Sequence, residues 1–401
     1  MRVAFLHPDL GVGGAERLIV DAAVGLQERG HSVTVFTNHR DVGHCFPEAR
    51  DGTLDVVVLG SWLPGSLFGR GKVLCATLRM LYAAVVMAVF YPRPEVAVLD
   101  QVATAVWLLR WAVWTRVVFY CHFPDLLLAP ASPSPLRRLY RAPFDALEEA
   151  ATVAADVVLV NSEFTGDTVM ATFPSMRTRP DVLYPAINVD AIDAGMRDAV
   201  ASPRNVAENT TFFSINRFER KKGIQLAVYA FAKVYAARAA TSPGLALVLA
   251  GGYDPNNTEN AEYFAELQDL VASLGLPDGV VTFAPSISNE EKYAYLDAAA
   301  AVLYTPANEH FGIVPVEAMY AQRPVIAVNS GGPTESIVDG VTGFLVDNTP
   351  DAFAQAMLRV LDEPGDREEM GREGRNRVVG NYVLSAFAAR LEEFCQQAQR
   401  A

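Results

Sequence analysis

The sequence is poor in cysteine, in positive charge and in long hydrophobic runs. Its 401 residues include four cysteines at widely separated positions, with no CxxC pair. That pattern excludes a disulfide-stabilised scaffold and a cysteine-based zinc site, and it is typical of proteins in a reducing compartment. The longest uncharged apolar stretch, from Met80 to Tyr91, is shorter than the roughly 20 residues that a membrane-spanning helix needs.

Basic residues are outnumbered by acidic ones, 33 to 46, which gives a net charge of −13. A chain with this charge has no overall attraction for nucleic acid, so we expect no nucleic-acid partner. The first residues form a short apolar run that Pro8 and Asp9 interrupt, which indicates a β-strand rather than a secretory signal. The length, with 51% hydrophobic residues, predicts a folded protein of two domains.

Short apolar runs alternate with helical stretches along both halves of the chain. The predicted strands of the first half are Val3–Leu6, Ser32–Thr37, Val56–Leu59, Val96–Leu99, Val117–Tyr120 and Val157–Val160. Those of the second half are Phe212–Ile215, Leu245–Ala250, Val280–Phe283, Ala301–Tyr304 and Val325–Val328. This alternation predicts parallel βαβ units, and hence an α/β protein of two Rossmann-like domains that face a central cleft. We place the domains at residues 1–185 and 186–375, with a C-terminal helix within 376–401 that packs back on the first domain.

In open α/β sheets ligands bind beyond the carboxyl ends of the strands, so the loops that follow strands are the informative ones. The first such loop contains Gly11, Gly13, Gly14 and Glu16. Its glycines let backbone N–H groups approach an anion at a helix N-terminus, although a tight turn without a ligand is the alternative. Glu16 occupies the last glycine position of a GxGxxG fingerprint, which argues against a nicotinamide cofactor.

Two further loops carry histidine and cationic side chains. His122 directly follows a predicted strand, with Asp125 three residues later. A histidine at this position can be packed in the structure or act in catalysis, and the sequence leaves both roles open. Between a strand and a helix of the second half, residues 217–222 contain four cations. We expect Arg217 and Lys222 to clamp a diphosphate, the alternative being an ordinary solvated surface.

The loop after Ala301–Tyr304 contains two carboxylates eight positions apart, Glu309 and Glu317. They flank a glycine turn and the start of a helix, so each can bind a different pair of hydroxyl groups. An acid/base pair for glycoside hydrolysis has the same composition, and the spacing alone does not exclude it. Residues 329–335, after the next strand, offer further backbone donors.

The region from Val73 to Trp114 is unusually apolar and contains Trp107, Trp111 and Trp114. One interpretation is a pair of buried core helices. The other is a surface that enters a membrane interface, where tryptophan and arginine side chains are favourable.

Taken in order on two Rossmann-like halves, these motifs resemble the retaining GT-B glycosyltransferases of family 4. The pattern E-x7-E at Glu309 and Glu317, with Arg217 and Lys222 upstream and the loop 13–16, carries the resemblance. Residues 7–17, 119–128, 214–222 and 304–315 are similar to the eukaryotic mannosyltransferases of the dolichol-linked oligosaccharide pathway.

This resemblance implies transfer of mannose from GDP-mannose, as a substrate, to a dolichyl-diphosphate-linked oligosaccharide. It implies an α-1,3 and then an α-1,6 addition to Man1GlcNAc2-PP-dolichol, at the cytosolic face of the endoplasmic reticulum membrane. The membrane surface and other enzymes of the pathway are then partners, and neither a cofactor nor a metal is expected. The alternatives are a family 4 transferase with another donor or lipid acceptor, a non-catalytic nucleotide-sugar-binding subunit, and a sugar epimerase.

The resemblance also assigns roles to residues. The catalytic set is Glu309, His122, Arg217 and Lys222. The donor-binding set, in the second domain, is Arg217, Lys222, Glu309, Phe311, Gly312, Ile313, Val314 and Glu317. The acceptor-side set, in the first domain, is Gly11, Gly13, Gly14, Glu16 and Asp125.

Overall fold

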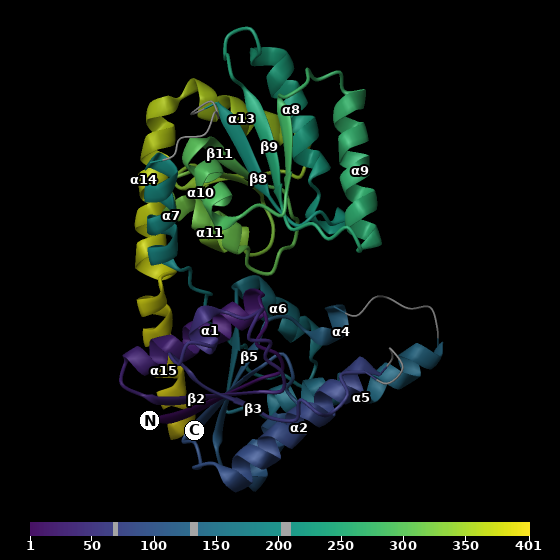
Figure 1. Ribbon diagram of the computed structural model, residues 1–401, viewed down its shortest axis with the longest axis vertical. Coiled ribbons are helices and arrows are strands. Elements are labelled where there is room, and N and C mark those ends of the chain that lie inside the picture. Colours follow the sequence, from purple (N-terminus) through teal and green to yellow (C-terminus); the bar gives the residue numbers. More distant parts are fainter. Residues whose placement is uncertain (67–70, 129–134, 202–209) are drawn as a thin grey trace. The chain divides into compact units, whose positions relative to one another are not determined.

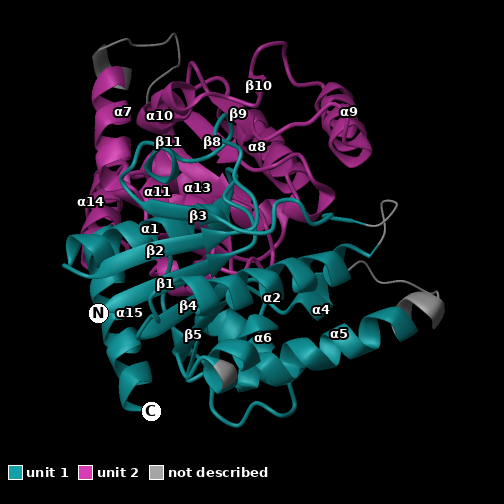
Figure 2. Ribbon diagram, turned by 60° about the horizontal axis from the view of Figure 1, so that its bottom comes forward, with its two compact units in different colours: residues 1–186, 384–401 teal, residues 187–383 magenta. Residues whose placement is uncertain are grey.

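The computed structural model describes residues 1–66, 71–128, 135–201 and 210–401 of the chain. The chain forms two compact units (Figure 2). Unit 1 comprises Met1–Ala186 with Leu384–Ala401, and unit 2 comprises Ile187–Val383. Each unit is built on one parallel sheet, as the alternation of strands and helices predicted.

Unit 1 contains a seven-stranded sheet in the order β3-β2-β1-β4-β5-β6-β7, and every neighbouring pair is parallel. The strands are β1 (Arg2–His7), β2 (Ser32–Thr37), β3 (Asp55–Val58), β4 (Val96–Asp100), β5 (Arg116–Cys121), β6 (Val157–Val160) and β7 (Asp181–Val182). The helices are α1 (Gly14–Glu28), η1 (Pro47–Ala49), α2 (Lys72–Phe90), α3 (Ala105–Trp107), η2 (Leu108–Ala112), α4 (Asp125–Leu128), α5 (Pro135–Val153), α6 (Glu163–Thr172) and α15 (Leu384–Arg400).

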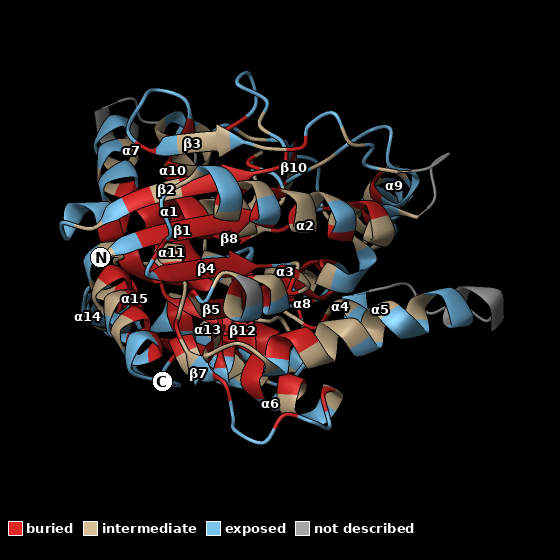
Figure 3. Cartoon of the chain, turned by 90° about the horizontal axis from the view of Figure 1, so that it is seen from below, coloured by how far each residue is buried: buried red, intermediate tan, exposed pale blue. Residues whose placement is uncertain are grey.

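Helices cover both faces of this sheet (Figure 1). Because side chains alternate along a strand, neighbours in β1 enter different halves of the core. Phe5 packs with residues of α1 and α15, whereas Leu6 packs with residues of α2, α3 and η2. The central strands are buried on both sides (Figure 3). The C-terminal helix α15 therefore completes the core of unit 1, although it is far from that unit in sequence.

Unit 2 contains a six-stranded sheet in the order β10-β9-β8-β11-β12-β13, again with parallel neighbours. The strands are β8 (Thr211–Ile215), β9 (Ala246–Gly251), β10 (Val281–Pro285), β11 (Ala299–Tyr304), β12 (Val325–Val328) and β13 (Gly343–Val346). The helices are α7 (Val189–Ala201), η3 (Arg220–Lys222), α8 (Gln225–Arg238), α9 (Thr258–Ser273), α10 (Asn289–Ala298), α11 (Ile313–Tyr320), α12 (Pro333–Ser336), α13 (Pro350–Asp362) and α14 (Pro364–Asn381).

The strand order reverses at one place in each sheet, between β1 and β4 in unit 1 and between β8 and β11 in unit 2. Connections leave such neighbouring strands in opposite directions, which opens a crevice at their carboxyl ends where ligands bind. The loops that follow β1, β4 and β5 share one such edge, and the loops that follow β8 and β11 share the other. The sequence marked the loops after β1, β5, β8, β11 and β12, and it did not mark the loop after β4.

The apolar region 73–114 is only half explained by core packing. The helix α2 buries Cys75, Met80 and Met87, and its opposite face leaves Leu78 and Val89 exposed. Within the part of the chain that the structure describes, α2 is the one helix whose length and composition would suffice to cross a membrane. The interpretation as a pair of buried core helices therefore accounts for only one face of α2.

Candidate active site

In unit 2, Lys222 and Glu309 form an ion pair at the point where the strand order reverses. Lys222 closes η3, after β8, and Glu309 lies in the loop after β11. The Lys222 Nζ donates to Glu309 Oε2, and the Thr305 hydroxyl donates to the Lys222 carbonyl at 2.7 Å. Burial alone would raise the pKa of Glu309, but the charge and hydrogen bond of Lys222, with smaller contributions from His310, outweigh burial and lower this pKa. The loop therefore presents an ionised carboxylate held by an ammonium group.

The backbone around Glu309 is shaped by the glycine loop that follows β12. The Gly332 N–H donates to the Glu309 carbonyl at 2.8 Å, and the Asn308 N–H donates to the Ser330 hydroxyl at 3.0 Å. Gly331 has φ of +66°, and a Cβ atom there would lie 2.4 Å from the Glu309 carbonyl oxygen. Only glycine permits this approach, so residues 329–335 pack directly against the backbone of the Glu309 loop and support it.

The second carboxylate of the E-x7-E pattern lies on a helix and has a lysine of its own. Glu317 projects from the second turn of α11 and accepts from Lys292 Nζ at 2.9 Å. Gly312 precedes α11 with φ of +85°, and the side chain of Ile313 at the first position is exposed. Phe311 is buried against the Tyr382 ring, with 5.9 Å between the centroids. Phe311 therefore packs into the core of unit 2, and the backbone at the start of α11 remains available to an anion.

Arg217 is the most accessible member of the predicted donor set, with 63% of its side chain exposed. It pairs with Glu219 Oε1 at 3.0 Å. The backbone before Arg217 runs close to the end of β9. Gly251, the last residue of β9, has φ of +136°, and a Cβ atom there would lie 2.0 Å from the Asn216 carbonyl oxygen. The guanidinium of Arg217 thus stands at the strand ends, where an anion can reach it.

The other two cations of this run are themselves exposed and pair with carboxylates other than Glu309. Arg220 pairs with Glu262 and Glu266 on α9, and Lys221 pairs with Glu219 at 3.1 Å. For these two residues the solvated-surface interpretation holds.

In unit 1, a buried carboxylate joins two histidines. Asp100, at the end of β4, accepts from His7 Nδ1 at 2.6 Å and from His122 Nε2 at 2.9 Å. His7 ends β1, and His122 follows β5 directly. Burial lowers the pKa of His7, but the opposing effects of Asp100 and Glu16 are larger together and raise this pKa to about 10. His122 is thus one end of a three-residue chain of polar contacts.

The predicted acceptor-side residues lie in two loops of unit 1. Glu16, in the first turn of α1, has Oε1 3.9 Å from His7 Nε2. A Cβ at Gly13 would lie 2.2 Å from Glu16 Oε2, so that glycine leaves room for the carboxylate. Asp125, at the start of α4, accepts from Arg141 Nη2 at 3.0 Å. The structure therefore brings Glu16 next to the histidine pair, and it directs Asp125 toward α5.

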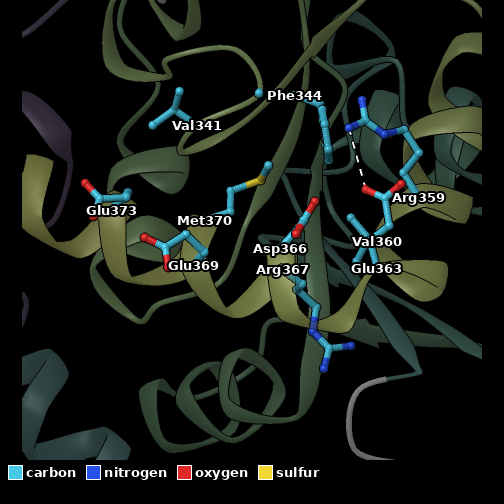
Figure 4. Close-up of a pocket in the computed structure, with 11 residues that line it drawn as sticks. Val341, Phe344, Arg359, Val360, Glu363, Asp366, Arg367, Glu369, Met370 and Glu373 are labelled. Atoms are coloured by element: carbon cyan, nitrogen blue, oxygen red, sulfur yellow. Dashed lines mark ion pairs between the residues drawn. The ribbon is translucent and has the colours of Figure 1, made fainter.

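The described residues form pockets away from these ion pairs, among them one of about 360 Å³ beside β6 and β7 in unit 1. Two more lie elsewhere. One, of about 270 Å³, lies in unit 2 between β13, α13 and α14 (Figure 4). Its lining includes the ion pair of Arg359 and Glu363 at 3.6 Å, and it contains none of the residues that the sequence singled out. The other, of about 260 Å³, lies in unit 1; Lys72 and Phe144 contribute to its wall, as does Asp125 of the predicted set.

Three polar residues of these sites escaped the sequence reasoning, which singled out neither His7, Asp100 nor Lys292. His7 and Asp100 each end a strand, so the rule that ligands gather at carboxyl ends of strands would have found them. Lys292 lies inside α10, and no local pattern distinguishes it. In the described ranges, no group of three or more His, Cys, Asp or Glu side chains has the arrangement of a metal site.

Comparison with solved structures places the fold. The sucrose-phosphate synthase of Thermosynechococcus elongatus aligns with a TM-score of 0.74 at 24% identity, over 99% of this chain and 98% of that one. The catalytic domain of starch synthase IV from Arabidopsis thaliana, bound to ADP and acarbose, aligns with a TM-score of 0.74 at 15% identity, over 100% and 99%. The fold is therefore GT-B, with two Rossmann-like domains, as expected from the motifs.

Comparison of sequences places the family. The model described as "Glycosyltransferase Family 4" matches residues 12–191, and that described as "Glycosyl transferases group 1" matches residues 197–377. The alpha-1,3/1,6-mannosyltransferase ALG2 of Homo sapiens is 45% identical over 398 residues, which cover 98% of this chain and 95% of the human protein. That of Rhizomucor pusillus is 44% identical over 414 residues, covering 98% and 90%. The resemblance seen in the motifs is confirmed along nearly the whole chain, and the protein belongs to the family of alpha-1,3/1,6-mannosyltransferases.

Proposed function

We propose that this glycosyltransferase moves mannose from GDP-mannose to Man1GlcNAc2-PP-dolichol, adding an α-1,3 and then an α-1,6 mannose. The observation that carries the proposal is the Lys222–Glu309 pair, with Arg217 accessible beside the same strand ends. Such a set offers cations to a diphosphate and a carboxylate to sugar hydroxyl groups, which are the two parts of a nucleotide sugar.

The physical problem in the reaction is the negative charge that the departing GDP gains. Lys222 and Arg217 would neutralise this charge, together with the backbone amides of Gly312 and Ile313 at the start of α11. Glu309 would hold mannose hydroxyls, and Glu317 would hold the ribose hydroxyls. Phe311 and Val314 would contribute by fixing the donor loop and the first turn of α11.

Retention of configuration without a protein nucleophile is accounted for by attack on the same face of the sugar. The bond from mannose C1 to the phosphate oxygen breaks, and the bond from C1 to the acceptor oxygen forms. The acceptor hydroxyl gives its proton to the departing phosphate oxygen, so no protein group gains or loses a proton overall. On the acceptor side, His122 would bind a sugar hydroxyl, and the loops with Gly11, Gly13, Gly14, Glu16 and Asp125 would line the acceptor.

The lipid acceptor requires a membrane surface, which we propose to be the cytosolic face of the endoplasmic reticulum. All four tryptophans of the chain have exposed side chains, Trp107 at 40% and Trp62, Trp111 and Trp114 at about 70% or more. The helix η2, which carries Trp111, packs against α2. We define the apolar face of unit 1 as Leu78, Val85, Val89 and Phe90 of α2 with Trp107, Trp111 and Trp114. Aromatic rings of this kind are favourable at the boundary between lipid and water.

Electrostatic attraction contributes little to this docking. Arg110 and Arg116 both pair with the buried carboxylate of Asp156, at 3.2 and 3.1 Å. The net charge of −13 opposes binding to anionic lipids. Attachment would therefore rest on burial of the apolar face in the lipid.

The decisive experiment incubates the purified protein with GDP-mannose and a phytanyl-diphosphate acceptor that carries one mannose on chitobiose. We expect two sequential hexose additions in the mass spectrum, both abolished in Glu309→Ala. The exposed Glu363→Gln variant serves as the matched control and should retain both additions. Transfer from a UDP-sugar in preference to GDP-mannose would refute the donor, and binding of GDP without any transfer would indicate a non-catalytic subunit.

A further inference from the structure

Three neighbouring strands of unit 1 bring two histidines to one buried carboxylate. The sheet order places β4 between β1 and β5. The register sets Leu6 beside Leu99, so His7 and Asp100 follow at the same level, and Asp100 lies beside Tyr120. Side chains two positions apart on a strand share a face, which brings His122 to the side of the sheet where Asp100 lies.

Charge balance decides the protonation of the first histidine. The side chains of His7 and Asp100 are both 0% exposed. A buried carboxylate without a compensating charge is strongly unfavourable, so His7 as an imidazolium is the partner that Asp100 needs. Glu16 faces the far side of the His7 ring, with Oε1 3.9 Å from Nε2, and Tyr120 is a further titratable neighbour of Asp100, beside the two histidines.

Geometry decides the tautomer of the second histidine. A carboxylate can only accept hydrogen bonds, so the proton shared at 2.9 Å lies on His122 Nε2. His7 stands between the carboxylates of Asp100 and Glu16, and because His122 turns Nε2 to Asp100, its Nδ1 is the ring nitrogen open to a ligand. The Asn161 amide donates to the His122 carbonyl at 3.0 Å and holds the backbone of the same residue.

We propose that His7 and Asp100 are positioning residues that hold His122 as a neutral ring with its proton on Nε2, so that Nδ1 accepts a hydrogen bond from a sugar hydroxyl. A ring in this state selects a hydroxyl donor, and it offers nothing to the phosphate oxygens of the nucleotide. The inference deepens the proposed function, on which it rests. The hydroxyl belongs either to the donor mannose or to the acceptor glycan.

The state of the ring is tested directly by long-range ¹H–¹⁵N correlation of the histidine side chains in the full chain. The His122→Gln variant, which removes one of six histidine signals, assigns the resonance. At pH 7.5 we expect a protonated Nε2 and a bare Nδ1 for His122, and two protonated nitrogens for His7. A proton on Nδ1 of His122 in the wild-type protein would overturn the proposal, whatever the enzyme's activity.

The role of Asp100 is tested by Asp100→Asn, because an amide can donate to Nε2 and thereby move the ring proton to Nδ1. We expect that shift in the spectrum, with kcat for transfer lowered about 10- to 150-fold, the range of a charge-assisted hydrogen bond. Asp156→Asn is the matched control, since Asp156 is equally buried and is held by Arg110 and Arg116. It should lower thermal stability without changing the His122 signal or kcat.

Hydrolysis of GDP-mannose without acceptor distinguishes the two sources of the hydroxyl. If His122 binds the donor mannose, Asp100→Asn lowers hydrolysis and transfer together. If it binds the acceptor, hydrolysis is retained and only transfer falls. Unchanged tautomer and kcat in a folded Asp100→Asn protein would refute the positioning role. Absence of transfer in the wild type would refute the proposed function alone, because the ring measurement does not depend on activity.

Discussion

The Lys222→Ala variant loses a positive charge that acts on two negatively charged groups. The ammonium group now pairs with Glu309, and in the proposed complex it also faces the diphosphate. Without it, burial is opposed only by the smaller effects of His310, and the pKa of Glu309 rises. Hydrogen bonds to charged groups contribute about 1.5–3 kcal/mol, which corresponds to a fall in kcat of about 10- to 150-fold. The acid limb of the pH profile of kcat should also move to higher pH, because Glu309 must be ionised to hold the sugar.

The assay measures initial rates of mannose transfer over a range of GDP-mannose concentrations. A fall in kcat with little change in KM indicates that Lys222 acts in the transition state, whereas a raised KM alone indicates binding of the ground state. The matched control is Lys233→Ala, since Lys233 of α8 forms an exposed ion pair with Asp351 at 2.9 Å. It should retain the wild-type rate.

A double-mutant cycle separates the two roles of Lys222. If the lysine acts only by holding Glu309, then Lys222→Ala adds nothing to Glu309→Gln. If it also neutralises the diphosphate, the double variant is slower than either single one. Wild-type kcat in a folded Lys222→Ala protein would refute both roles and the reasoning from the ion pair.

Three further predictions follow from other parts of the structure. Gly331→Ala should destabilise unit 2 by about 1–3 kcal/mol and lower activity, because the new Cβ meets the Glu309 carbonyl at a φ of +66°; unchanged thermal unfolding would contradict this. The pKa of His7 is raised to about 10 by folding, so its stabilising contribution is complete below about pH 6.5 and disappears as pH rises through 10, at up to about 1.4 kcal/mol per pH unit. Urea unfolding of wild type and His7→Gln across that window should give free energies of unfolding that converge at high pH. A constant difference between the two proteins would show that the charge of His7 does not stabilise the fold. Trp111→Ala and Trp114→Ala should each weaken binding to neutral vesicles about tenfold, and added salt should have little effect, whereas Val379→Ala in unit 2 should change nothing. Vesicle binding that is lost in salt would show that charge, and not the apolar face, holds the protein.

Much of the fold was predictable because local sequence carries the period of a buried strand. The strands β2, β6 and β12 occur at the predicted residues, and the others differ by a residue or a few at their ends. The sequence reasoning missed β7 and β13. Asp181–Val182 has only two residues, whereas the apolar run 344–346 of β13 was a local signal that could have found that strand. The domain bounds 1–185, 186–375 and 376–401, with their acceptor and donor roles, stay predictions. The structure assigns α14 to unit 2 and α15 to unit 1.

The residues of the candidate site were predictable from the sequence, whereas most of the contacts between their side chains were not. Glu309, Arg217, Lys222 and His122 lie in segments that follow strands, and Glu317 lies in the helix after the Glu309 loop, which are positions that the chain order reveals. Nothing local shows that Glu317 meets Lys292, 25 positions earlier, or that Arg220 points away to α9. Those pairings depend on how helices pack on the sheet.

The sequence by itself determined the class of the protein, because periodicity, glycine turns and the order of charged loops are properties of neighbouring residues. Only the tertiary structure decided which charges meet. Asp100 joins His7, 93 positions away, and His122, 22 positions away, because parallel strands align their carboxyl ends at one edge. It also decided that the tryptophans are exposed, since their places in the sequence do not reveal which side of each segment the core will take.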